Sequence, residues 1–220
     1  MTRVRICVCL TLLAAALALW GCSQQPRFVA VDEPWRDDEE RACLASGVVR
    51  ETPFIAMSSL GGPDVCGALR PFSVSATANG AVQLKPVALF RCPMIPAVDR
   101  WVQRVVMPAA QYHFGAQVVE LKVAASYSCR PMNNVDGAKL SEHGHANAVD
   151  IAAFVLADGR MVSIKTGWAG SPAERRFLHA VHNGACQVFS TVLGPDYDSN
   201  HHDHFHLDLA RHGGSGVICR

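Results

Sequence analysis

Near the end of the chain the sequence is NHHDHFHLDL, residues 200–209, which holds four of the ten histidines. Its apolar residues alternate with His204, His206 and Asp208. A period of two predicts a β-strand with one face in the core and the other carrying two imidazoles and a carboxylate. Such a face suits a metal ion, and imidazole favours zinc. The plainer alternatives are a histidine-rich surface loop and hydrogen-bonded core histidines.

A second polar stretch lies upstream, SEHGHANAVD at residues 141–150. His143 and Asp150 are not at the i, i+4 spacing of two ligands on one helix. Small residues between them let the chain turn tightly, and the alternation that follows predicts a strand. Two histidines and one carboxylate from separate points of the two stretches can fill three corners of a tetrahedron. The fourth stays open for water, as in catalytic zinc sites rather than closed structural ones.

The two stretches together resemble the motifs of a family of zinc peptidases. The family pattern is S-x-H-x-x-G-x-A-x-D followed by H-x-H, and residues 141–150 and 204–206 match it with one alanine in place of the glycine. The family groups lysostaphin, the D-alanyl-D-alanine peptidases, murein endopeptidase A and the hedgehog signalling domain. Within it the chain is most similar to the bacterial extensin-like C-terminal proteins. It shares with them YSCR at residues 127–130 and HFHLD at residues 204–208, and the resemblance covers the chain from around residue 40 to its end.

The resemblance implies that His143, Asp150 and His206 are zinc ligands. It also implies that His204 lies beside the zinc-bound water and that Arg130 contacts substrate or developing charge. The period of two places His204 on the same strand face as His206, which makes it the first candidate for the general base.

Asp203 is the second candidate base. It stands where the D-alanyl-D-alanine dipeptidases carry a glutamate, three residues before the last ligand, but its side chain is shorter. A regular strand also points it away from the face of His204. Asp208, on that face, is placed to orient a ligand histidine from outside the metal.

The first 21 residues have the composition of an export signal. Arg3 and Arg5 precede an apolar run, residues 6–20, that is too short and wrongly flanked for a membrane span. An N-terminal core helix is the alternative interpretation.

The signal ends in LWGC, residues 19–22, which is similar to a bacterial lipobox. We therefore expect cleavage before Cys22 and lipidation of Cys22. Trp20 is unusual there and leaves ordinary secretion open. Ser23 rather than aspartate after the cysteine favours the outer membrane. Residues 22–40 are polar and proline-containing, which predicts a tether and then a helix start.

Cysteine usage agrees with export to an oxidising compartment. Of the nine cysteines, Cys7 and Cys9 leave with the signal and Cys22 would carry lipid, so six remain and suit up to three disulfides. The sequence does not choose among their pairings, although Cys186 with Cys219 is the pair that we expect. The remaining six are Cys43, Cys66, Cys92, Cys129, Cys186 and Cys219.

Residues 41–220 predict a single α+β domain, with a small, mainly antiparallel sheet, helices on one face and the zinc site on the other. Alternation and turn residues predict its elements. They are a hairpin near residues 72–84, a helix over 96–115 bent or ended by Pro108, a strand over 118–125, a hairpin around Asp158-Gly159, a helix opened by a capping box at Ser171, and a strand over 187–193.

These features favour a zinc-dependent peptidase acting on peptidoglycan stem peptides or cross-bridges in the cell envelope. The substrate is implied by the resemblance and the compartment. One alternative is a peptidoglycan-binding or scaffold lipoprotein that keeps zinc without hydrolysis, and another is an envelope lipoprotein without metal. With 20 Lys and Arg against 19 Asp and Glu, the chain has no basic excess that would indicate nucleic acid. Membrane contact is expected through the lipid anchor only.

Overall fold

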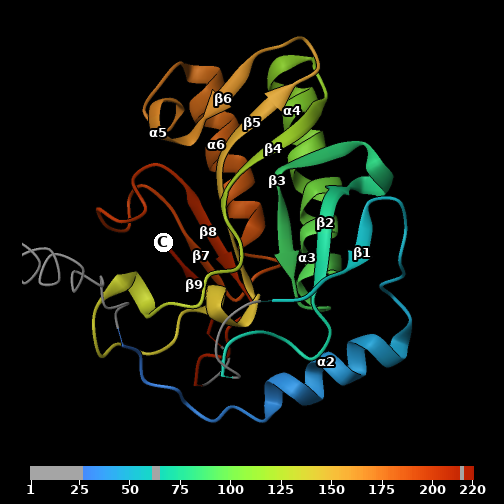
Figure 1. The fold of residues 1–220 in the computed structure, drawn as a ribbon. Helices are drawn as coiled ribbons and strands as arrows, with labels where there is room; N and C mark the ends of the chain where they lie inside the picture. Colours follow the sequence, from blue (N-terminus) through green and yellow to red (C-terminus); the bar gives the residue numbers. More distant parts are fainter. Residues whose placement is uncertain (1–26, 61–64, 214–215) are drawn as a thin grey trace, which may run out of the picture.

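The computed structural model describes residues 27–60, 65–213 and 216–220, so the expected signal and Cys22 lie outside the described residues. The described strands form one mixed sheet in the order β1-β2-β3-β4-β5-β8-β7-β9, with β6 beside β5 (Figure 1). All neighbours are antiparallel except the pairs β3–β4 and β7–β9. The strands are β1 (Ile55–Met57), β2 (Phe72–Thr77), β3 (Val82–Phe90), β4 (Val118–Ala125), β5 (Ala148–Leu156), β6 (Met161–Ser163), β7 (Thr191–Leu193), β8 (Phe205–Asp208) and β9 (Ile218–Cys219).

Helices cover one face of this sheet, and Figure 1 shows α3, α4 and α6 packed behind its central strands. The predicted α+β class with a mainly antiparallel sheet is confirmed. None of the helices within the described ranges combines the length and apolar character needed to cross a lipid bilayer. The helices and helical turns are α2 (Trp35–Ser46), η1 (Ala78–Gly80), α3 (Met94–Trp101), η2 (Val102–Val106), α4 (Met107–Phe114), η3 (Met132–Asn134), η4 (Glu142–His145), α5 (Ile164–Gly167) and α6 (Pro172–Ala185).

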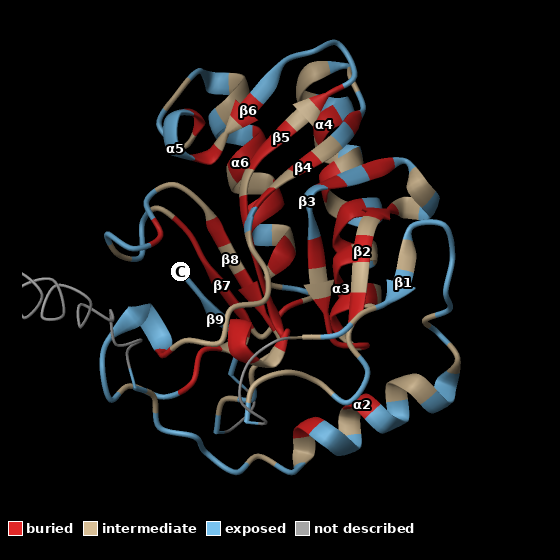
Figure 2. Ribbon diagram, in the orientation of Figure 1, coloured by how far each residue is buried: buried red, intermediate tan, exposed pale blue. Residues whose placement is uncertain are grey.

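The core lies between the sheet and these helices (Figure 2). Trp101 of α3 is fully buried and contacts Phe154 and Phe189 edge to face, at ring centroid distances of 6.1 and 6.2 Å. Burying each such side chain contributes about 1.5–3 kcal/mol relative to leaving it exposed. The core therefore fixes β5, the strand that carries Asp150.

The helix expected over residues 96–115 is present, but Pro108 does not end it. A π-helical turn, η2, precedes the proline, and α4 then continues to Phe114. In a regular helix the proline ring would clash with the carbonyl of Arg104, one turn earlier. The wider π turn relieves that clash, so α3, η2 and α4 run on as one helical segment.

Several local predictions are confirmed. Ser171 and Glu174 form the capping box of α6, and β5 and β6 pair across Asp158-Gly159. The strand expected from residue 187 begins only at Thr191. The amides of residues 187–189 instead donate to carbonyls in the last turn of α6, which keeps these residues out of the sheet.

Three disulfides join the residues that the structure describes, and the expected pair Cys186–Cys219 is one of them. It joins the end of α6 to β9 at the sheet edge. The other two link α2 to the start of α3 and residue 66 to the loop after β4. They are Cys43–Cys92 and Cys66–Cys129.

Candidate metal centre

Two neighbouring strands and one turn bring the expected ligands together. Asp150 on β5 pairs directly with His206 on β8 in the antiparallel register. Along each strand they alternate with core residues such as Ile151 and Phe205, so both project away from the packed core. His143 comes from η4, where the Ser141 hydroxyl caps the turn by accepting from the His143 amide at 3.4 Å.

Ala146 ends the η4 turn, at the position where the zinc-peptidase pattern that the chain resembles has glycine. Ala146 has φ 51° in the left-handed region and is fully buried. Glycine adopts this conformation freely, whereas alanine costs about 1–2 kcal/mol. The chain nevertheless turns as the motif requires and enters β5 two residues later.

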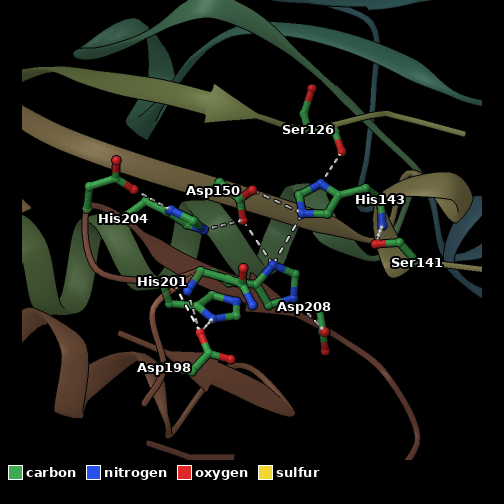
Figure 3. A network of polar contacts seen from close by, with 11 residues as sticks. Ser126, Ser141, His143, Asp150, Asp198, His201, His204 and Asp208 are labelled. Carbon is green, nitrogen blue, oxygen red and sulfur yellow. Dashed lines mark hydrogen bonds and ion pairs between the residues drawn. The ribbon is translucent and has the colours of Figure 1, made fainter. Parts of the chain in front are cut away.

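The ligand atoms of His143, Asp150 and His206 all lie within 4.8 Å of one another. Figure 3 shows the His143 ring and the Asp150 carboxylate facing each other. His143 Nε2 is 3.2 Å from Asp150 Oδ2 and 3.2 Å from His206 Nδ1. His206 Nδ1 is 2.9 Å from Asp150 Oδ1. Their exposed side-chain fractions are 1%, 8% and 12%. We call these three residues the HHD cluster.

The outer nitrogen of each histidine in the HHD cluster has its own acceptor. His143 Nδ1 lies 2.5 Å from the carbonyl oxygen of Ser126, so it must donate there. His206 Nε2 lies 2.9 Å from Asp208 Oδ2 and donates to that carboxylate. These contacts leave His143 Nε2 and His206 Nδ1 to present lone pairs to each other across 3.2 Å. Two facing lone pairs beside a carboxylate require a cation between them, either a proton or a metal.

The pKa values of the HHD cluster also indicate that a cation lies between its inner atoms. Burial lowers the pKa of His206, but Asp150 and Asp208 outweigh it and raise the pKa to about 10. Burial raises the pKa of Asp150, yet hydrogen bonds from His143 and His206 hold that pKa far below its usual range. Without a metal, the cluster therefore holds a proton that a metal ion would displace.

A pocket of about 360 Å³ opens onto the HHD cluster. His204 and Arg130 line it. His204 Nε2 lies 3.7 Å from Asp150 Oδ1, and its Nδ1 donates to Asp203 Oδ1 at 3.0 Å. Asp203 is not among the described residues that line the pocket. It is therefore placed to orient His204 rather than to face the cluster.

The sequence did not predict that His201 lines the pocket beside the HHD cluster. Its side chain is only 9% exposed and lines the same pocket. Its Nδ1 lies 2.6 Å from Asp198 Oδ1, and its ring centroid is 5.3 Å from that of His204 (Figure 3). The i, i+3 spacing of Asp198 and His201 was the available signal. By contrast, His202 is exposed and contacts the carbonyl of Ser199.

A second group of possible ligands lies apart from the pocket. His182, Cys186 and Cys219 have ligand atoms within 4.8 Å of one another, and we call them the HCC cluster. The two sulfurs are bonded to each other, and His182 Nε2 contacts the carbonyl of Arg220 at 3.1 Å. In this state the cluster offers no thiolate to a metal.

The fold and site define an α+β protein with a two-histidine, one-aspartate cluster at the floor of a pocket. The chain belongs to the family described as extensin-like protein C-terminus, whose model matches residues 41–220. Comparison with curated proteins and with solved structures gave no match in either case.

Proposed function

We propose that the protein is a zinc-dependent peptidase that cleaves peptidoglycan stem peptides or cross-bridges in the periplasm. The observation that carries the proposal is the convergence of His143 Nε2, His206 Nδ1 and the Asp150 carboxylate beneath a pocket that also holds His204. An anchor at the outer membrane through lipidated Cys22 is part of the proposal and rests on the lipobox-like LWGC sequence.

The donor set fits zinc. Two imidazole nitrogens and one carboxylate oxygen are one of the ligand sets found in catalytic zinc sites, with bonds of about 2.0–2.2 Å. A tetrahedron with such bonds has edges of about 3.3 Å, close to the 3.2 Å between His143 Nε2 and His206 Nδ1. Asp150 meets these two nitrogens with different oxygens, Oδ2 at 3.2 Å and Oδ1 at 2.9 Å. Ser126 and Asp208 fix the outer nitrogens, as partners outside the ligand set commonly do. The pocket leaves one side of the cluster open.

Zinc bound there would lower the pKa of water to about 7 and polarise a peptide carbonyl. The chain must supply the proton transfers. Because His204 Nδ1 donates to Asp203, His204 Nε2 presents a lone pair at the edge of the HHD cluster. It would accept the proton of the attacking water and return it to the leaving amine.

Two further side chains complete the proposed reaction site. His201, held by Asp198, faces the pocket from the same loop and offers a second nitrogen to the substrate or to a proton. Arg130 carries a permanent positive charge at the pocket wall, where it would bind substrate or stabilise developing charge on the carbonyl oxygen.

The substrate class rests on two supports. The motifs resemble those of peptidases that act on cell-wall peptides, and the three disulfides are those expected of an exported protein. Together they favour peptidoglycan over other peptides.

The test is to incubate purified protein, zinc-loaded, with peptidoglycan of several cross-link chemotypes, with and without a chelator. We expect new amino termini that disappear on chelation and return with zinc. A protein that holds one zinc but releases no peptide ends from any chemotype would support the binding or scaffold alternative. A protein without bound zinc would support the metal-free alternative.

A further inference from the structure

The segment before the family match is attached to the loop that leads to His143. The amide of Val29 donates to the carbonyl of Ala138 at 2.8 Å, and the amide of Leu140 donates to the carbonyl of Val29 at 3.1 Å. The Arg27 amide donates to Asp136 Oδ1 at 2.6 Å. Residues 27–29 thus run alongside the loop, although the matched region begins only at residue 41.

Arg36, in the first turn of α2, makes a stronger link to the same loop. Its Nη1 donates to Glu142 Oε2 at 2.7 Å and its Nη2 to Glu142 Oε1 at 2.5 Å. The two side chains are only 10% and 13% exposed. Parallel charged hydrogen bonds of this kind fix orientation as well as distance, and little water competes with them here.

Glu142 is held on its other side too. Asn147 Nδ2 donates to Glu142 Oε2 at 2.6 Å, and the Asn147 amide donates to the Glu142 carbonyl at 3.0 Å. Asn147 is fully buried and immediately precedes β5. The Glu142 carboxylate therefore connects the η4 turn to Arg36 of α2 on one side and to Asn147, just before β5, on the other. His143 is the next residue along that turn.

Two neighbouring carboxylates, of Glu142 and Glu33, stabilise the positive charge on Arg36. Burial lowers its pKa, but Glu142 and Glu33 outweigh that effect and raise it. Removing the guanidinium would leave Glu142 buried without its main partner, a state that is strongly unfavourable. The turn would then rearrange to reach water, and the His143 ring would move with it.

We propose that Arg36 is a positioning residue of the candidate zinc centre, acting through Glu142 to hold the turn that presents His143. The inference rests on the proposed function only in requiring that the HHD cluster binds zinc. Residues 27–40 belong to the stretch 22–40, which the sequence predicts to be a tether and then a helix start, and on this proposal they help to hold the site.

The test is the zinc affinity of the full chain, measured by competition with a chromogenic chelator. Partners outside the ligand set commonly contribute about 10–100-fold to metal affinity, and we expect a loss in that range for Arg36→Gln. Arg36→Lys keeps the charge without the fork and should lose less. Arg41→Gln is the matched control, because Arg41 lies on the same helix but its ion pairs with Asp37 and Asp38 are exposed.

A second control separates positioning from general stability. Leu84→Ala destabilises the buried core at β3, away from the η4 turn, and should leave zinc affinity unchanged. Wild-type affinity in folded Arg36→Gln, or an equal loss in Leu84→Ala, would overturn the inference while leaving the peptidase proposal intact. If Arg36→Gln does not fold, unchanged affinity in Arg36→Lys has the same meaning. A wild-type protein that binds no zinc overturns both proposals.

Discussion

The HHD and HCC clusters offer a comparison within one fold. Each holds three side chains of metal-binding type with ligand atoms within 4.8 Å of one another. In the HCC cluster the sulfurs are consumed by a disulfide, and the His182 ring packs edge to face against Trp168 and Phe205. In the HHD cluster the inner atoms face one another and a pocket.

The difference lies in which ligand atoms other bonds have left available. The outer nitrogens of the HHD cluster are committed to Ser126 and Asp208, which leaves the inner nitrogens as acceptors. His182 Nε2 also donates to a backbone carbonyl, but the sulfurs beside it are joined in a disulfide and carry no thiolate. Proximity of ligand types is therefore insufficient, because a metal needs ligand atoms that other bonds have not taken.

The largest expected effect is loss of zinc from the HHD cluster. His206→Ala should reduce zinc affinity by more than about 100-fold, because a ligand should contribute more than its outer partners, which contribute about 10–100-fold. His182→Ala, in the HCC cluster, should bind zinc as the wild type does. Equilibrium dialysis with metal analysis measures both. Full zinc occupancy in His206→Ala would show that the assignment of ligands is wrong.

The next effect concerns activity without loss of metal. His204→Ala should keep zinc and lose about 10²–10⁴-fold in peptide release, the usual contribution of a general acid–base group. His179→Ala, which removes a ring stacked on Trp168 near the HCC cluster, is the control and should keep both properties. If Asp203→Ala is more damaging than His204→Ala, the carboxylate is the base instead.

The disulfide of the HCC cluster should matter for stability alone. Replacing both Cys186 and Cys219 by serine should lower the free energy of unfolding by about 2–4 kcal/mol, because the unfolded chain gains freedom. Zinc affinity of the folded variant should be unchanged. Urea denaturation and chelator competition give the two numbers. Weakened zinc binding would mean that the HCC cluster takes part in metal binding after all.

The smallest expected effect is a change in pH dependence. Burial lowers the pKa of His182 below its ordinary 6.5. As the pH falls through 6.5, His182 binds a proton in the unfolded chain but stays neutral in the folded protein. The free energy of unfolding therefore declines. His182→Gln should flatten this part of the stability–pH curve. Urea titrations at a series of pH values check it, and an equally steep decline in the variant would contradict it.

The sequence predicted those parts of the molecule that local signals determine. The capping box at Ser171, the Asp158-Gly159 hairpin and strand β4 each follow from residues adjacent in the chain. The strand alternation also placed His204 and His206 on one face, and the resemblance grouped them with Asp150, which both contact in the structure.

What the sequence left open depends on distant contacts. The Cys43–Cys92 and Cys66–Cys129 pairs depend on how the chain folds back on itself. The ion pair of Arg36 with Glu142 joins residues 106 positions apart. The sequence around either residue does not indicate which residue it pairs with. The π turn before Pro108 is likewise one of several ways to accommodate a proline within a helix.

The most direct measurement is the position of the metal itself. Crystals of the zinc-loaded protein, recorded at the zinc absorption edge, should show one anomalous peak within about 2.0–2.2 Å of His143 Nε2, His206 Nδ1 and an Asp150 oxygen. A peak at the HCC cluster, or no peak beneath the pocket, would contradict the account.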